Sequence, residues 1–571
     1  MILSRRYQIL FLVFICLGLY YPTIFNTTLS IDDADMVVRM DNGTFDWRGL
    51  FSPHSSFYYR PLLILTFWID KWLWAFDPTF SLLENILLHA VNTILVYSLV
   101  ERFFNADRKH NYLSFFCALI FATHPIATES INWMSGRTDL LATFFVLLSV
   151  LLLKKALDDG SWGYLIGSVC IYLCGILSKE VVVFFLPAGL YLIYLHGFKK
   201  MDSGFGKLWQ PLLLYMAPVV GGAGGYVIYR LIRQGSSAKG LTYLMERIPY
   251  DCFDIFRVSF KVFGFYVKKL FIPVPLNFAI VKISDGYVVL GAVAVVLLCW
   301  MLYRRNLRWA FLLIAFYMIT PAIIIALTNV AWTPVAERYI YLSSAFIAVG
   351  IGGVALNYAE NRKSFRIGAL IILLWVVPAS VVTAQRSLMW QDKEALYADT
   401  LKKSPGFDRL RNEYGLALYK GNSEHDALVQ LRQGQSSRGT YYAVVNEARI
   451  YFINGELEKG RGVLLTREPE IEKMGAQALK MLAHIDVKRL DGVENEEKKE
   501  IIAELFTIHG LLYRKSRDPF FLYRSGQLAL SLGDKKKAQE LFAKAYKHAK
   551  SSAHYKVAAG KLAEKLLKEL E

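Results

Sequence analysis

Two adjacent carboxylates, Asp32 and Asp33, follow the first long apolar run of the 571-residue chain. Each carboxylate raises the pKa of its neighbour, and a charge beside a membrane is costly unless it is paired or used. A general base or a cation site uses such a pair. A solvated acidic loop or a helix N-cap gives the same sequence without chemistry. Which alternative applies depends on the residues that the fold brings to the pair.

More ionisable residues lie at the borders of later apolar runs. An arginine at a membrane border suits a phosphate, because its planar fork binds bidentately and stays charged. The structural alternatives are helix caps, interfacial ion pairs and side chains that reach lipid headgroups. The set is more specific than any single member. It comprises Arg60; His124, Glu129, Arg137 and Asp139; Lys179 and Glu180; and Glu337 and Arg338.

The apolar runs that must position these residues predict eleven membrane-spanning helices. Hydrophobic residues make up 54% of the chain, which is more than an ordinary soluble protein carries. Residues 254–272 have mixed basic and aromatic faces, which predicts a helix at the membrane surface. The expected spans are 7–25, 81–100, 112–123, 139–153, 162–177, 181–196, 209–229, 287–303, 309–327, 340–358 and 367–384.

Clusters of Lys and Arg between the runs set the predicted orientation. If Arg5 and Arg6 are cytoplasmic, every other basic cluster up to 359–366 falls on that side, as the positive-inside rule requires. This pattern accounts for the net charge of +17 without a nucleic-acid partner. The ionisable residues at the span borders and everything after 384 then lie on the extracytoplasmic side. We expect a plasma (inner) membrane protein facing the periplasm, or the lumenal face of the endoplasmic reticulum in a eukaryote.

The composition changes after the last span, which predicts a membrane domain over 1–388 and a helical domain over 389–571. A 34-residue offset relates Tyr414 and Gly421 to Ala448 and Gly455. This period is typical of tetratricopeptide repeats, whose helix pairs stack into an α-solenoid. An unrelated helical bundle is the alternative. The predicted fold class is all-α. The second domain holds no catalytic constellation, and the chain has no P-loop or dinucleotide fingerprint.

In their order along the chain, these motifs resemble those of a known family. The motifs are Asp32-Asp33, Tyr59-Arg60-Pro61-Leu62, Asn85 with His89, His124-Pro125 with Glu129, Gly136-Arg137 with Asp139, Lys179-Glu180, Glu337-Arg338 and Trp390 with Leu396. The ordered set is similar to that of the transmembrane O-mannosyltransferases with tetratricopeptide repeats, strongly from 30 to 190 and weakly from 200 to 330. The compact size and the cysteine-free second domain indicate a prokaryotic relative.

The resemblance implies a GT-C fold and an inverting glycosyltransferase. Its donor would be a sugar, mannose in this family, on a polyprenyl phosphate, and its acceptor a protein Ser or Thr hydroxyl. Asp32 would be the general base and Asp33 would tune it or bind the donor; both would hold a divalent metal if one is used, and no other cofactor is expected. Arg338 would bind the lipid phosphate. The donor pocket would be completed by Arg137, Arg60, His124, Glu129 and Lys179, supported by Asp139, Glu180 and Glu337.

Two other functions stay open. The enzyme could modify a lipid or a cell-surface glycan, with the repeats binding a partner enzyme instead of a protein acceptor. A non-catalytic transporter or scaffold in the bilayer could use the repeats for assembly. A transporter should carry inverted repeats and charges at mid-span, whereas the ionisable residues here lie at span borders.

Overall fold

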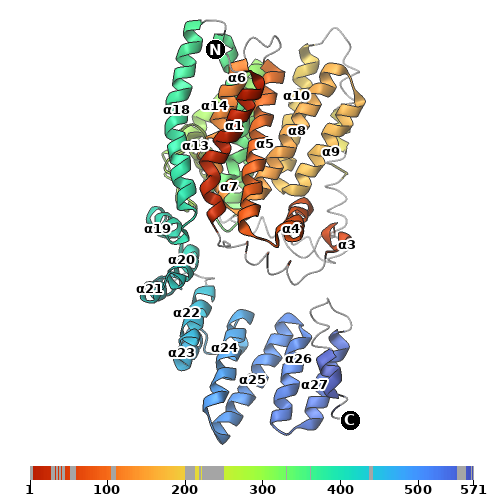
Figure 1. The fold of residues 1–571 in the computed structure, drawn as a ribbon, viewed down its shortest axis with the longest axis vertical. Helices are drawn as coiled ribbons and strands as arrows, with labels where there is room; N and C mark the ends of the chain where they lie inside the picture. The colour runs from red at the N-terminus through yellow and green to blue at the C-terminus, as the bar shows by residue number, and fades with distance from the viewer. Residues whose placement is uncertain are drawn as a thin grey trace. The chain divides into compact units, whose positions relative to one another are not determined.

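The computed structural model forms two compact units, one ending at Ser404 and one beginning at Pro405 (Figure 1). The sequence-based boundary at 388 lies before helix α19 (Lys393–Lys403), which is part of the first unit. The structure describes residues 4–26, 33, 37, 40, 45–51, 59–104, 111–199, 212–217, 220–221, 250–328, 331–359, 362–435, 441–549, 561–567 and 569.

The first unit is built from helices, and its described residues contain one isolated antiparallel bridge, between Ile280 and Val335. A lipid-exposed segment must satisfy its own backbone polar groups, which is why apolar runs of this length become helices. The helices are α1 Arg5–Tyr20, α3 Trp47–Phe51, α4 Pro61–Trp74, α5 Pro78–Phe104, α6 Asn111–Ala122, α7 Ala127–Asn132, α8 Arg137–Asp159, α9 Trp162–Ser178, α10 Phe185–Lys199, α13 Cys252–Phe271, α14 Tyr287–Arg304, α15 Leu307–Tyr317, α16 Thr320–Thr328, α17 Tyr341–Ala359, α18 Arg362–Met389 and α19.

Seven helical segments of the described chain are long and apolar enough to cross a membrane. They are Arg5–Phe25, Pro78–Phe104, Met134–Asp159, Tyr287–Arg304, Leu307–Thr328, Glu337–Leu356 and Arg366–Met389. Three shorter apolar helices, Tyr112–Ala122, Trp162–Ser178 and Glu180–His196, coincide with three more predicted spans. The predicted span at 209–229 lies largely outside the described residues. The total of eleven therefore stays a prediction.

Helix α5 is central to the first unit, because it packs against α1, α6, α8 and α17. Its buried polar groups find partners on other helices, as a membrane interior requires. The Tyr97 hydroxyl donates to Gln8 at 2.9 Å, and the His89 ring lies 2.7 Å from the Tyr341 hydroxyl. These bonds fix the register of α1 and α17 on α5.

Helix α13 runs antiparallel to the candidate span α14 at very short range. A Cβ atom on Gly264 would lie 2.2 Å from the Tyr287 carbonyl oxygen, and one on Gly291 would lie 2.0 Å from that of Phe260. Only glycine permits such an approach, as at small-residue crossings in membranes. This packing places α13 alongside α14. Helix α13 is not among the seven segments that are apolar enough to cross a membrane, and its position at the membrane surface stays a prediction.

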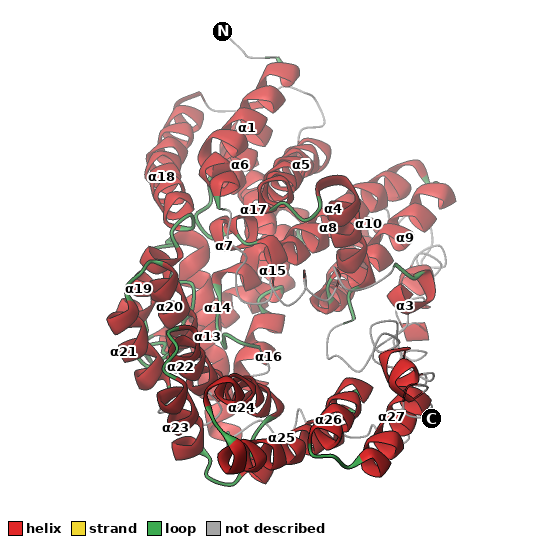
Figure 2. Ribbon diagram, turned by 60° about the horizontal axis from the view of Figure 1, so that its bottom comes forward, coloured by secondary structure: helices red, strands yellow, loops and turns green. Residues whose placement is uncertain are grey.

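The second unit is a row of paired helices. Figure 2 shows α20, α22, α24 and α26 along the inner side of an arc and α21, α23, α25 and α27 along its outer side. Their bounds are α20 Asp408–Lys420, α21 Glu424–Gly434, α22 Tyr441–Ile453, α23 Leu457–Arg467, α24 Ala476–Arg489, α25 Asn495–Ser516, α26 Pro519–Ser531 and α27 Lys535–Ala549. Small residues allow the pairs to close. Gly526, for example, lies directly against the Phe542 ring.

Candidate functional site

Arg338 and Glu129, which lie 209 residues apart, form a buried ion pair in the first unit. Glu129 lies on the short helix α7, and Arg338 lies on the 3-10 turn η6 (Glu337–Ile340) before α17. The Glu129 carboxylate also accepts the backbone N–H of Arg338 at 3.0 Å. Of the two side chains, Glu129 is 3% exposed and Arg338 is 11% exposed. The guanidinium is therefore the more accessible half of a fixed pair.

Aromatic rings surround this guanidinium and lead to a second buried pair. The Arg338 guanidinium carbon lies 4.8 Å from the Trp133 ring centre and 4.9 Å from that of Tyr339. The Lys179 ammonium lies 6.0 Å from the same Tyr339 ring and is ion-paired with Asp139. Tyr339 thus stands between two cations, each neutralised by its own carboxylate.

Asp33 is joined to this region through Ser135. The Asp33 carboxylate is buried and accepts the backbone N–H of Ser135 at 3.1 Å and also its hydroxyl. Ser135 lies on the turn η2 (Met134–Gly136), which follows Trp133 directly. This turn requires glycine at 136, because a Cβ there would lie 2.3 Å from the Ser130 carbonyl oxygen. Asp32 lies outside the described residues.

Arg137 is enclosed by oxygen atoms that the sequence did not reveal as its partners. Its guanidinium donates to Asp70 at 2.8 Å, Asn85 at 3.0 Å and the Ser81 carbonyl at 2.8 Å, and lies 3.1 Å from Glu84. The Arg137 side chain is 3% exposed and that of Asp70 is fully buried. Asp70 follows one apolar run and Glu84 opens another, so sequence spacing gave no signal of the pairing.

The remaining predicted residues form two further ion pairs. Arg60 holds Glu180 bidentately at 2.9 and 2.6 Å, and this pair is partly exposed. Glu337 pairs with Lys269 at 2.6 Å and accepts the backbone N–H of Asn277 at 3.0 Å. Lys269 comes from the end of α13, a helix that the sequence reading had not connected to the site.

His124 is buried with both ring nitrogens committed. Its Nε2 lies 3.0 Å from the Leu270 carbonyl oxygen, and its Nδ1 accepts the backbone N–H of Ile126 at 3.3 Å. This pattern requires the neutral tautomer that carries its proton on Nε2. Burial lowers the pKa of His124 to about 4. The ring therefore ties the end of α6 to the end of α13.

Burial also shifts the two titratable partners that flank Tyr339. It raises the pKa of Glu129, an effect that the Arg338 charge opposes, and it lowers the pKa of Lys179, which Asp139 opposes. Three polar atoms nearby, Asp139 Oδ2, Trp133 Nε1 and Ser130 Oγ, are buried and have no partner among the described residues. Such atoms are costly unless a ligand or water satisfies them.

No group of three or more His, Cys, Asp or Glu side chains suited to a metal gathers among the described residues. The metal position predicted at Asp32 and Asp33 includes one residue outside that part of the chain. The structure therefore leaves this prediction untested.

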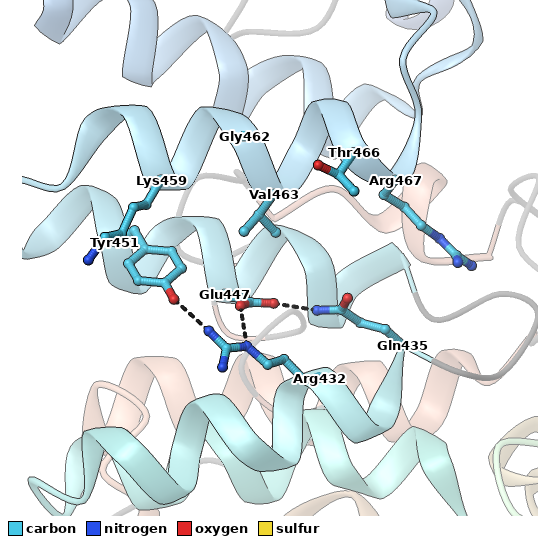
Figure 3. A pocket seen from close by; sticks show the side chains of 9 residues that line it. All are labelled: Arg432, Gln435, Glu447, Tyr451, Lys459, Gly462, Val463, Thr466 and Arg467. Carbon is cyan, nitrogen blue, oxygen red and sulfur yellow. Dashed lines mark hydrogen bonds and ion pairs between the residues drawn. The ribbon is translucent and has the colours of Figure 1, made fainter.

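The second unit contains a separate polar pocket of about 630 Å³ between α21, α22 and α23 (Figure 3). Arg432 crosses its floor, donating to Glu447 at 2.8 Å and to the Tyr451 hydroxyl at 2.7 Å. Lys459 and Arg467 stand on the α23 wall. The sequence reading singled out none of these residues.

Comparison with known proteins gives the class first. Residues 76–220 match the family model described as dolichyl-phosphate-mannose-protein mannosyltransferase. This stretch includes Glu129, Arg137, Asp139 and Lys179. Together with the seven apolar helices, the match identifies an integral membrane protein similar to that family.

The more specific likeness is to the TMTC proteins. Protein O-mannosyl-transferase TMTC1 of Homo sapiens is 34% identical over 160 residues, which are 26% of this chain and 17% of the human protein. Protein O-mannosyl-transferase TMTC2 of Mus musculus is 35% identical over 142 residues, covering 24% of this chain and 16% of the mouse protein. Protein O-mannosyl-transferase F38B6.6 of Caenorhabditis elegans is 22% identical over 414 residues, which are 70% of this chain and 56% of the nematode protein.

The alignments therefore span about a sixth of the first two relatives and just over half of the third. The similarity to the TMTC proteins that the ordered motifs predicted is confirmed, and the prokaryotic origin stays a prediction.

Proposed function

We propose that this chain is an inverting GT-C glycosyltransferase that passes mannose from a polyprenyl phosphate to a protein Ser or Thr hydroxyl on the extracytoplasmic side. One observation carries the proposal. The stretch that matches the mannosyltransferase model, 76–220, supplies Glu129, Asp139 and Lys179, which the fold gathers around Tyr339 beside Arg338.

The reaction assigns a task to each group. The acceptor oxygen forms a bond to the anomeric carbon while the bond from that carbon to the phosphate oxygen breaks. The acceptor proton passes to Asp32, and the polyprenyl phosphate leaves with the bonding electrons. A phosphate is already a good leaving group, so a base and a cation suffice. Asp33, held by Ser135, positions the base.

Arg338 is the cation that receives the departing phosphate in this scheme. Glu129 and the Trp133 ring hold the guanidinium in place before the donor arrives, so little ordering is needed during reaction. The unpartnered atoms of Asp139, Trp133 and Ser130 supply acceptors and donors that suit sugar hydroxyls. We also propose that the second unit is a tetratricopeptide-like repeat array that binds the acceptor or a partner protein.

The test uses the full chain in nanodiscs with radiolabelled mannosyl polyprenyl phosphate and a cell extract. We expect label in protein, and we expect Asp32→Asn to abolish transfer while the melting temperature stays unchanged. Transfer close to normal by this variant would remove Asp32 from the mechanism. Label in a lipid or a glycan would support the alternative acceptors, and no labelled product with any donor would favour a transporter or scaffold.

A second test concerns Arg338. Arg338→Lys keeps the charge but loses the planar fork, so we expect kcat/KM for the donor to fall about 10- to 100-fold, the range for a charged hydrogen bond. The matched control is Arg386→Lys, which alters another buried pair, Arg386 with Asp399 at 2.8 Å. Equal losses in both variants would mean that Arg338 has only a structural role.

A further inference from the structure

The inner helices of the second unit present four basic side chains on one surface. Arg449 lies on α22, Lys480 and His484 on α24, and Arg524 on α26. The first three are exposed and Arg524 is partly buried. The Lys480 ammonium lies 5.9 Å from the ring centre of Phe521, which places the α24 and α26 bases on adjoining surfaces. We call these four residues and the apolar neighbours named next the inner face.

Exposed apolar side chains accompany the bases. Tyr442 is 63% exposed, Ile453 59% and Phe520 45%, and Val487 is also exposed. Tyr442 and Ile453 lie seven and four residues from Arg449, Phe520 lies four from Arg524, and Val487 lies three from His484. Residues at these spacings lie on the same side of a helix. Large exposed hydrophobic groups next to charges mark an interaction surface.

The acidic residues of the same helices point elsewhere. Glu447 of α22 is buried and pairs with Arg432 of α21, and Asp486 of α24 is buried and pairs with Arg461 of α23. Two residues correspond to about 200° around a helix, so Arg449 points away from Glu447 and His484 points away from Asp486. Both acidic residues therefore pair with arginines of the outer helices, and among the described residues of α22, α24 and α26 no acidic side chain shares the inner face with the bases.

The surroundings of His484 reflect this charge. Partial burial and the positive charges of Arg449, Lys480 and Arg524 lower its pKa. His509, one layer deeper on α25, is buried with its Nδ1 unpartnered among the described residues. Basic side chains from α22, α24 and α26 therefore lie close enough to act on one another.

We propose that the inner face binds an extended, acidic segment of a polypeptide that also carries apolar side chains. Charge complementarity identifies the acidic groups, and Tyr442, Ile453 and Phe520 account for the apolar ones. The three helices that carry this face lie along the inner side of an arc (Figure 2). An extended chain can follow a concave row of helices more closely than a flat bilayer can.

Helix spacing predicts the register of this segment. Packed helices lie about 8–10 Å apart. An extended chain in the polyproline II conformation has three residues per turn and advances about 3.1 Å per residue, so every third side chain lies on the same side, about 9 Å farther along. Acidic side chains at every third position would therefore meet bases on α22, α24 and α26 in turn. Apolar side chains between them would reach the exposed aromatic and aliphatic groups.

The experiment measures fluorescence anisotropy of a labelled peptide with the full chain in zwitterionic nanodiscs. The probe has glutamate at every third position and leucine between. We expect saturable binding that weakens with salt. A peptide of the same composition with its glutamates clustered at one end should bind at least about tenfold more weakly, as should a lysine version. Equal binding of the clustered peptide would overturn the proposed register and with it the site.

The charge-reversed variant Arg449→Glu with Lys480→Glu should lose glutamate-peptide binding and gain binding of the lysine peptide, which a misfolded variant cannot do. The matched control is Lys498→Glu with Lys536→Glu, both exposed on the outer helices α25 and α27. Equal loss in the control would reduce the effect to net charge and overturn the site. Binding to anionic vesicles in place of peptide would assign the face to a membrane.

The inner face acts without the transferase chemistry, so the Asp32→Asn variant should bind the peptide normally. This separates failure of the docking surface from failure of the proposed function.

Discussion

At the scale of single residues, the site is a set of buried charges that neutralise one another in pairs. Glu129 with Arg338 and Asp139 with Lys179 surround Tyr339, while Arg137 is enclosed by Asp70 and Glu84. Ionised groups tolerate this depth only with a partner and further hydrogen bonds. The pairs differ in how many hydrogen-bonding groups are already taken by the protein. This difference distinguishes residues that stabilise the fold from residues that can bind a substrate.

Arg137 is predicted to stabilise the fold, although its position in the motif suggests donor binding. Its donors already face Asp70, Asn85 and Ser81. Arg137→Met leaves buried Asp70 without a cation and should cost about 3–5 kcal/mol, measured as a lower melting temperature in detergent. Adding Asp70→Leu should restore part of the loss, because both charges are then gone. Unchanged stability with weaker donor use would show that Arg137 binds the donor.

His124 predicts an acid-sensitive fold. Its pKa in the folded chain, about 4, is below the usual value for histidine because burial disfavours the charged ring. The free energy of unfolding is therefore highest above about pH 6.5, where His124 is neutral in both the folded and the unfolded chain. It falls by up to about 3 kcal/mol as the pH drops toward 4 and below, because the unfolded chain binds the proton first. His124→Gln keeps a donor for Leu270 and does not titrate. The fall in melting temperature between pH 7 and pH 5 should therefore be smaller in this variant, and an unchanged fall would assign the acid sensitivity to other groups.

Sequence identified most members of these pairs but not the pairing. Ionisable residues at the ends of apolar runs are conspicuous, so Glu129, Asp139, Lys179 and Arg338 could be selected from type and position alone. Their partners lie up to 209 residues away and are determined by which helix ends meet. Lys269 and Glu84 were missed, because a lysine or glutamate near a helix end is common and becomes specific only through its neighbour.

At the scale of elements, α13 is the helix to which the structure adds most beyond the sequence. Its five charged residues favour the membrane surface, since a span seldom carries so many. In the structure, Gly264 and Gly291 bring α13 and α14 into backbone contact, and Lys269 at the end of α13 pairs with Glu337. Sequence could not reveal the crossing, because each glycine is informative only with the facing carbonyl in view.

A helix that follows α14 across the membrane has its two ends at opposite membrane faces. Cys252 begins α13 and is exposed, and Phe271 ends it and is also exposed. In a chain with the other cysteines replaced, a membrane-impermeant maleimide added to sealed vesicles should then label either Cys252 or the cysteine of Phe271→Cys, but not both from one side. Labelling of both from one side would place α13 on the membrane surface.

At the scale of the whole molecule, the chain divides into two units whose hydrophobic cores share no member. The first core gathers around α5 and α17, and the second runs through α22 to α27. Units with their own cores can fold separately. The sequence anticipated two parts because the composition changes abruptly, whereas the position of the division depends on the packing of α19, which composition does not report.

This division predicts that a chain ending at Ser404 keeps its fold and its donor chemistry. The charged pairs around Tyr339 and the cores that hold them all lie before that residue. Under the proposed function, the truncated chain in nanodiscs should melt near the temperature of the intact membrane unit and still transfer mannose slowly to water or to a short Ser peptide. Transfer to a protein acceptor should fall far more, since the inner face is gone. A truncated chain that folds but has lost all donor turnover would mean that the second unit completes the active site, and the division of labour proposed here would then be wrong.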